Sequence, residues 1–226
     1  MIRSLLVSLL FFPLSAFAAD KHIGILVFDG VLSSDVTAPA EVFGVASRQA
    51  WFKDYQVTLI GIDASPTVTT EEGIRLTVDA SITDDIALDA LIVPSSYSME
   101  PLINNEALIE FLQTKSRQVS WLGSNCSGAF LLGEASLLNQ KSATTWAGGE
   151  KDLQKSYPAI NVVENKNVVI DGNIITSNGS LVSYQAALIM LAKMSSLNNA
   201  KSVFEALQMQ RITPWTDIID LIEENE

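Results

Sequence analysis

The sequence predicts an α/β protein with a mostly parallel central sheet and helices on both faces. Continuous apolar runs, typical of strands that are buried on both sides, occupy residues 22–28, 55–62 and 88–93. Segments with a helical spacing of apolar residues alternate with these runs, an order that is typical of parallel sheets. Because no linker-like stretch or internal repeat interrupts the pattern, we expect one domain over residues 19–226.

The remaining elements continue this alternation. After the turn at Gly30, helical spacing begins at Ala40, directly behind Pro39. Residues 66–82 alternate weakly around Gly73 and predict a hairpin or an irregular excursion. The same criteria predict a strand at 118–123, two or three short strands within 160–176, and helices at 40–46, 105–116, 129–138, 181–194, 200–210 and 215–226.

The first residues have the pattern of a secretory signal peptide. Arg3 precedes an apolar run over residues 5–12, and Ala16 and Ala18 form the small-residue pattern of a cleavage site. The run is too short to cross a bilayer and is followed by Pro13. We therefore expect a signal peptide at residues 1–18, a periplasmic or secreted mature protein, and no stable association with a membrane.

Composition argues against several partners and cofactors. The chain has 26 acidic against 14 basic residues, and its net charge of −12 repels nucleic acid and anionic lipid. It ends about 15 residues after Arg211, too few for a helix-turn-helix domain. One cysteine and one histidine form no cluster of soft metal ligands, and no glycine-rich phosphate loop is visible. We expect no metal and no cofactor, and a small-molecule substrate or ligand as the partner.

Polar residues follow three of the predicted strands at the points where those strands end. Asp35 comes after the first strand, Ser95 and Ser96 come after the third, and Cys126 with Ser127 comes after the fourth. Parallel α/β sheets bind ligands beyond the carboxyl ends of their strands. We therefore expect these five residues to share one site.

Cys126, the only cysteine, has the setting of a nucleophile elbow, between an apolar strand and a helix that begins at once. A helix N-terminus favours the thiolate, so we expect a lowered Cys126 pKa and selective oxidation of this thiol. The N–H of Ser127 is expected to point toward a developing oxyanion, and Gly128 allows close packing of the helix. A small buried thiol without reactivity is the alternative interpretation.

Four motifs, spread over residues 23–194, carry a family resemblance. They read VFDGVLSSDVTAPAEVF at 27–43, ALIVPSS at 90–96, GSNCSGAFLLGEASLLNQKSATTW at 123–146 and IITSNGSLVSYQAALIML at 174–191. Together they resemble the ThiJ/PfpI family of the class I glutamine amidotransferase-like superfamily, and within it the isonitrile hydratase-like subgroup and related domains of some transcriptional regulators. The resemblance implies a flavodoxin-like three-layer sandwich with a nucleophile elbow, and a homodimer.

The resemblance also implies roles for the site residues. It places the family nucleophile on Cys126 and the neighbouring acid on Asp35. Ser127 stands where isonitrile hydratases have a threonine with a part in catalysis, and it keeps a hydroxyl. The oxyanion pocket would use backbone N–H groups of Ser95, Ser96 and Ser127. Judged from the residues alone, Asp35 also fits the role of a helix N-cap.

The chain departs from the family pattern at two places. Trp146 stands where many relatives have a histidine, and the only histidine, His22, begins the first strand as a structural or exposed edge residue, so no Cys–His dyad can form. Ser95 and Ser96 replace a Pro-Gly-Gly turn and remove the freedom of glycine to adopt a positive φ. We expect an altered or inactive pocket.

Two functions of different classes remain open. In the first, the protein is a lyase of the isonitrile hydratase kind: the Cys126 thiolate attacks an electrophilic carbon, Asp35 moves protons, Ser127 assists, and water completes hydration to a formamide. In the second, the same fold and thiol serve non-catalytic small-molecule binding or a cysteine-based redox response, because fold alone does not fix function. Contact between a carboxyl oxygen of Asp35 and the Cys126 sulfur would support a tuned thiol, and separation would favour the N-cap role of Asp35.

Overall fold

A seven-stranded sheet forms the centre of the computed structural model, which describes residues 21–49 and 55–223. The expected signal peptide lies outside the described residues. The strand order is β10-β11-β7-β6-β1-β2-β5, and all neighbours are parallel except the antiparallel pair β10 and β11. The mostly parallel sheet is therefore confirmed. Its strands are β1 (Lys21–Val27), β2 (Tyr55–Gly61), β5 (Ala80–Ser81), β6 (Ala90–Val93), β7 (Trp121–Asn125), β10 (Val168–Asp171) and β11 (Ile174–Ser177).

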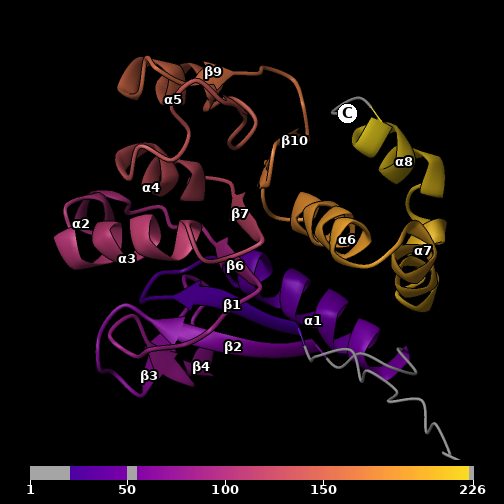
Figure 1. Ribbon diagram of the computed structural model, residues 1–226, viewed down its shortest axis with the longest axis horizontal. Helices are drawn as coiled ribbons and strands as arrows, with labels where there is room; N and C mark the ends of the chain where they lie inside the picture. Colours follow the sequence, from indigo (N-terminus) through magenta and orange to yellow (C-terminus); the bar gives the residue numbers. More distant parts are fainter. Residues whose placement is uncertain (1–20, 50–54, 224–226) are drawn as a thin grey trace, which may run out of the picture.

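Helices cover both faces of this sheet (Figure 1). One face carries α1 (Ser33–Gln49) and α6 (Val182–Met194), with α7 (Leu197–Ala206) and α8 (Trp215–Glu223) packed beside them. The other face carries α3 (Glu106–Ser116) and α4 (Gly128–Glu134), with α2 (Glu100–Ile103) against α4. The predicted three-layer sandwich is confirmed. The smaller elements are β3 (Thr67–Thr69), β4 (Arg75–Thr77), β8 (Ser142–Ala143), α5 (Glu150–Ser156), β9 (Asn161–Val162) and a short 3-10 turn at Met209–Arg211.

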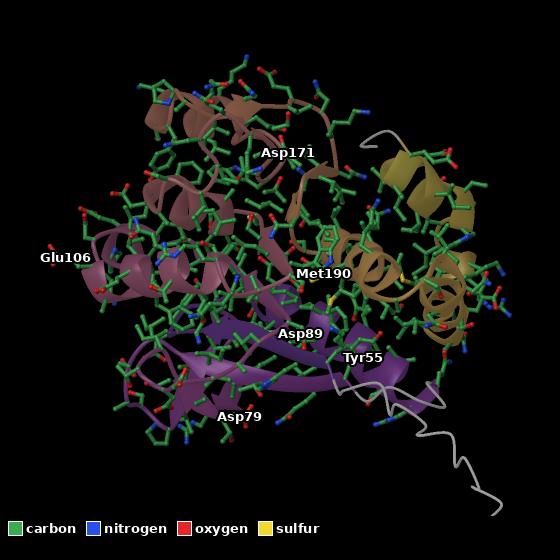
Figure 2. All side chains as sticks on the ribbon, in the orientation of Figure 1. Tyr55, Asp79, Asp89, Glu106, Asp171 and Met190 are labelled. Atoms are coloured by element: carbon green, nitrogen blue, oxygen red, sulfur yellow. The ribbon has the colours of Figure 1, made fainter. Side chains whose placement is uncertain are left out.

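Continuous apolar segments place the inner strands and α6 in the core. All four residues of β6 are buried, as expected for a strand with helices on both sides. Met190 of α6 is buried between that helix and β7 (Figure 2). Each such large apolar side chain contributes about 1.5–3 kcal/mol through burial. Among the residues that the structure describes, no helix is long and apolar enough to cross a membrane.

The prediction that the first helix begins after Pro39 was wrong, because α1 begins at Ser33 and includes Pro39. A proline has no N–H to donate to the carbonyl four residues earlier, which here belongs to Asp35. That carbonyl instead accepts the side-chain amide of Asn125 at 3.3 Å. Pro39 therefore frees a backbone acceptor that connects α1 to the end of β7.

Other boundaries moved by a few residues. The strand expected at 118–123 is β7, which continues to Asn125 and so ends directly before Cys126. The helix expected at 129–138 is the shorter α4. The excursion at 66–82 contains a hairpin of β3 and β4 followed by β5, and residues 160–176 contain β9, β10 and most of β11, as predicted.

Candidate active site

Cys126 lies in a tight turn between β7 and α4. Its φ is +49°, a value that is uncommon for a residue other than glycine. The turn packs directly on the end of β6: a Cβ on Gly128 would lie 2.3 Å from the carbonyl oxygen of Val93. The expected requirement for glycine at 128 is therefore confirmed, and the strand, sharp turn and helix have the form of a nucleophile elbow.

Register brings three chain segments together at this edge of the sheet. Val93 of β6 pairs with Ser124 of β7, and Asn125 pairs with Ser177 of β11, all in parallel. The residues that follow these strands therefore leave the sheet side by side. Cys126 donates its N–H to the carbonyl of Ser177 at 2.9 Å, which fixes the elbow against the third segment.

Asp35 is fully buried and holds its carboxylate within a set of serine donors. Oδ2 accepts a 2.5 Å hydrogen bond from the hydroxyl of Ser95. Oδ1 accepts the N–H of Ser180 at 2.9 Å and the hydroxyl of Ser183 at 2.8 Å. Burial raises the pKa of this carboxyl, and the serine donors oppose that rise. The N-cap interpretation was wrong, since Asp35 lies inside the first turn of α1 and its carboxylate bonds to other segments.

Asp35 and Cys126 lie close together without a direct hydrogen bond between their side chains in the part of the chain that the structure describes. A Cβ on Gly179, whose φ is +80°, would lie 2.4 Å from Cβ of Cys126 and 3.1 Å from Oδ1 of Asp35. Only glycine fits between the two groups. The hydroxyl of Ser95, which is bonded to Asp35, lowers the pKa of the Cys126 thiol and so favours the thiolate.

The prediction of a lowered Cys126 pKa was wrong. Burial raises the pKa of the thiol, and the negative charge of Asp35 raises it further. The N–H of Ser127 and the hydroxyl of Ser95 favour the thiolate but do not outweigh those two effects. Helix α4 has only seven residues, fewer than the ten predicted at 129–138, so its dipole favours the thiolate less than expected.

Two of the three expected oxyanion donors are engaged elsewhere. The N–H of Ser96 donates to Oγ of Ser127 at 3.2 Å, and that hydroxyl donates back to the carbonyl of Ser96 at 2.9 Å. The backbone N–H of Ser95 lowers the pKa of the Asp35 carboxyl and so acts on that group. Of the three N–H groups, only that of Ser127 lowers the pKa of the Cys126 thiol. The Ser127 hydroxyl therefore connects the elbow to the Ser95-Ser96 turn.

A cavity of about 830 Å³ opens at Cys126. Phe130 and Trp146 form one of its walls, with ring centroids 5.4 Å apart and planes inclined by 24°. Leu32, Met99 and other apolar side chains contribute further lining, and the described residues that line the cavity include no Asp, Glu, Lys, Arg or His. The cavity therefore suits a neutral molecule with an apolar portion.

Trp146 reaches the cavity through a segment that is fixed to the elbow. The hydroxyl of Thr145 donates to the carbonyl of Cys126 at 2.8 Å, and the amide of Asn178 donates to the carbonyl of Thr145 at 2.5 Å. The only histidine, His22, lies near the amino end of β1, away from the carboxyl ends of the strands where Cys126 lies. Its Nε2 pairs with the hydroxyl of Thr58 at 2.6 Å, so its structural role is as predicted. Strand β1 lies between β6 and β2, however, and is not an edge strand of the sheet.

Several residues of the site were missed by the sequence argument. Ser180 and Ser183 bond to the carboxylate of Asp35, and Asn125 bonds to its backbone carbonyl. Oδ1 of Asn125 in turn accepts the hydroxyl of Ser177 at 2.7 Å. The run SNGS at 177–180 follows an apolar strand, the same signal that identified the other loops. These residues were not predicted to join the site, because the sequence does not show that β11 lies parallel to β7.

No group of three His, Cys, Asp or Glu side chains within residues 21–49 and 55–223 is placed to hold a metal ion. The site therefore consists of a thiol, a buried carboxyl, serine hydroxyls and an apolar cavity. These groups define an α/β protein with an elbow cysteine and a neighbouring acid, a class in which a thiol can add to an electrophilic carbon.

Comparison with known proteins identifies the family of the chain. The model of the DJ-1/PfpI family matches residues 21–192, and the chain belongs to that family. It is 32% identical to the isonitrile hydratase of Pseudomonas putida over 195 residues, covering 86% of this chain and 81% of the relative. A ThiJ/PfpI family protein from Pseudomonas syringae has the same fold, with a TM-score of 0.75 at 22% identity, covering 85% of this chain and 76% of the other.

Some relatives are regulators. The chain is 23% identical to the HTH-type transcriptional regulator GbdR of Pseudomonas aeruginosa over 192 residues, covering 85% of this chain. It spans about half of that relative, 52% of its length. The relatives of this chain thus include proteins with different names and roles.

Proposed function

We propose that the protein hydrates isonitriles to N-substituted formamides, with Cys126 as the nucleophile. The observation that carries this proposal is the elbow thiol at the mouth of an apolar cavity, with the carboxyl of Asp35 buried beside it. The similarity to an isonitrile hydratase supports the same chemistry. Because Trp146 replaces the family histidine, the proton must move through Asp35.

The reaction balances with these groups alone. The sulfur forms a bond to the terminal carbon of R–N≡C, and the same carbon takes the proton that the thiol gave up, which leaves a thioimidate on Cys126. Water then adds to that carbon and the nitrogen takes a proton. Cleavage of the carbon–sulfur bond returns the thiol and releases R–NH–CHO. Asp35 holds the proton between the steps, and the Ser127 N–H stabilises negative charge on the sulfur.

The cavity lining favours an apolar group on the isonitrile nitrogen. Phe130 and Trp146 offer a flat apolar wall to an aryl or cycloalkyl group. A substrate with a charge would lose its hydration without a partner of opposite charge in this cavity, which is costly. Neutral aryl and cycloalkyl isonitriles are therefore the proposed substrate class.

A second function, binding of a neutral ligand without turnover, is supported by two observations. The cavity is large enough for a small molecule, and relatives include a transcriptional regulator. The redox form of this alternative has less support, because a thiol whose pKa is raised exposes less thiolate to oxidants. Binding without chemistry needs no acid beside Cys126, so the two functions differ in their dependence on Asp35.

The test is conversion of phenyl and cyclohexyl isonitrile to the formamides, followed by chromatography, with methylglyoxal as a competing substrate class. We expect formamide from the intact protein and none from Cys126→Ala. Ser127→Ala should be slower by a smaller factor, since its N–H remains while the connection to Ser96 is lost. Tight binding of an isonitrile or formamide without turnover would support the ligand-binding function, and turnover of methylglyoxal alone would contradict the proposal.

A further inference from the structure

Asn178 is fixed beside Cys126 by the chain on both sides of it. The residue before it, Ser177, accepts the N–H of Cys126 on its carbonyl at 2.9 Å. The residue after it is Gly179, where an added Cβ would lie 2.4 Å from Cβ of Cys126. The backbone N–H of Asn178 itself donates to the carbonyl of Asn167 at 2.9 Å. Backbone contacts therefore set the position of Asn178 relative to the thiol.

The side-chain amide of Asn178 has one atom left for a ligand. Its Nδ2 donates to the carbonyl of Thr145 at 2.5 Å, and the atom that faces a carbonyl must be the nitrogen, because a carbonyl only accepts. The amide is planar, so this bond also fixes the direction of Oδ1. No donor within residues 21–49 and 55–223 reaches Oδ1, and Asn178 lines the same cavity as Cys126. Oδ1 is therefore a fixed hydrogen-bond acceptor that a ligand in this cavity can use.

We propose that Oδ1 of Asn178 accepts the N–H of the formamide and of the intermediate before it, an inference that rests on the proposed isonitrile hydration. An isonitrile R–N≡C has no hydrogen on its nitrogen and nothing to donate to this oxygen. After water has added to the thioimidate carbon and the nitrogen has taken a proton, the intermediate R–NH–CH(OH)–S carries an N–H. The formamide R–NH–CHO keeps that N–H when the carbon–sulfur bond breaks. Asn178 therefore distinguishes the states after nitrogen protonation from the isonitrile.

An uncharged acceptor suits the chemistry of this cavity. The described residues that line it carry no charged side chain, so a neutral N–H meets Oδ1 without competition from a stronger acceptor in the lining. An amide does not titrate, so Asn178 does not compete with Asp35 for the thiol proton. A ligand without a donor would displace water from Oδ1 and leave it unpaired, which costs binding energy. The ligand class that this oxygen selects is a neutral secondary amide with an apolar group on its nitrogen.

The test compares N-cyclohexylformamide with cyclohexyl formate, an ester of nearly the same size and shape in which oxygen replaces the N–H. Binding is measured by isothermal titration calorimetry on the full chain with Cys126→Ala, because this variant has no thiol to take the formyl group from the ester. We expect the amide to bind about tenfold or more tightly than the ester. Equal affinities, or no binding of the amide, would overturn the proposed role of Asn178.

Two variants, each made in the Cys126→Ala chain, assign the preference to Asn178. Asn178→Leu removes the amide and keeps the size of the side chain, and Asn178→Ala leaves more room; in both, the affinity for the amide should fall to that for the ester. Tyr97→Phe is the matched control, because it removes a polar group from the same cavity on the segment after β6. There the preference should stay within about threefold. Circular dichroism and thermal melts confirm that each variant is folded. A preference that survives both Asn178 variants, or that Tyr97→Phe abolishes equally, contradicts the assignment.

Product inhibition of isonitrile turnover provides a second readout, with Cys126 present. In Asn178→Leu the inhibition constant of N-cyclohexylformamide should rise about tenfold, while KM for cyclohexyl isonitrile changes by less than about threefold, because only the formamide carries an N–H. An equal rise in both constants would show that Asn178 acts on the apolar group, against the proposal. An amide preference that depends on Asn178, found together with no isonitrile turnover by the intact protein, would support the acceptor and contradict the proposed hydration.

Discussion

Burial and then the charge of the Asp35 carboxylate raise the pKa of the Cys126 thiol, so these two residues are electrostatically coupled. Asp35 has two opposite effects on the reactivity of Cys126. Its charge makes the thiolate harder to form, and its carboxyl accepts the proton during turnover. Removing the charge should therefore make the thiolate easier to form and stop proton transfer.

We predict that Asp35→Asn lowers the midpoint of the alkylation rate against pH and reduces isonitrile turnover by about 10²-fold or more. The lower midpoint follows from the loss of the negative charge beside the sulfur. Glu41→Gln is the control, because Glu41 is an exposed acid on the same helix that bonds to the hydroxyl of Tyr184. It should change neither property. A higher alkylation midpoint in Asp35→Asn would contradict the coupling.

The raised pKa of Asp35 also predicts how stability depends on pH. An acid whose pKa is higher in the folded state binds more protons there, so the free energy of unfolding falls as pH rises from the unfolded value of 3.8 to the folded pKa. The Asp35→Asn variant has no carboxyl at this position, so its free energy of unfolding does not fall with pH for this reason. It should be more stable than the unmodified protein at pH 7, by roughly 1 kcal/mol, with the difference shrinking toward pH 3. Denaturant titrations at both pH values measure it; equal stability at pH 7 would contradict the buried charge.

Substrate selection should depend on the aromatic wall. Trp146→Ala removes the ring stacked on Phe130 and should raise KM for phenyl and cyclohexyl isonitrile about tenfold or more, with a smaller effect on methyl isonitrile. Trp215→Ala is the matched control, because Trp215 packs edge-on against Phe204 at the other side of the fold. An equal change for all three isonitriles would show that Trp146 does not contact the substrate.

Export is a prediction from the first residues alone. Arg3, the apolar run over 5–12 and the alanines at 16 and 18 predict cleavage after Ala18. Mass spectrometry of protein from the producing cell should find a mature N-terminus at Ala19 or Asp20. An intact N-terminus at Met1 in the cytosolic fraction would contradict export.

The sheet and the main loops could be predicted because buried strands appear in the sequence as continuous apolar runs and alternate with helical segments. Continuous apolar runs identified β1, β2, β6 and β7, and the polar residues behind them identified Asp35, Ser95 and Cys126 as neighbours. The start of α1 could not be predicted, because Pro39 ordinarily marks a helix boundary and here its missing N–H is offset by Asn125.

The electrostatics of the site could not be predicted from the same pattern. A helix N-terminus behind Cys126 favours a low pKa of the thiol. The burial of the sulfur and the charge of Asp35 raise that pKa instead, and both depend on tertiary packing. The serines at 180 and 183 are far from Asp35 in sequence and approach it only because β11 lies beside β7.

The central claim is that the Cys126 sulfur bonds to the isonitrile carbon. Rapid mixing with phenyl isonitrile, an acid quench and intact-mass spectrometry test it most directly, with peptide mapping to locate the adduct. We predict an increase equal to the mass of the isonitrile on the peptide that contains Cys126, formed before formamide appears, and no increase in Cys126→Ala. Formamide production by Cys126→Ala at the rate of the intact protein, with no adduct in either, would contradict the account.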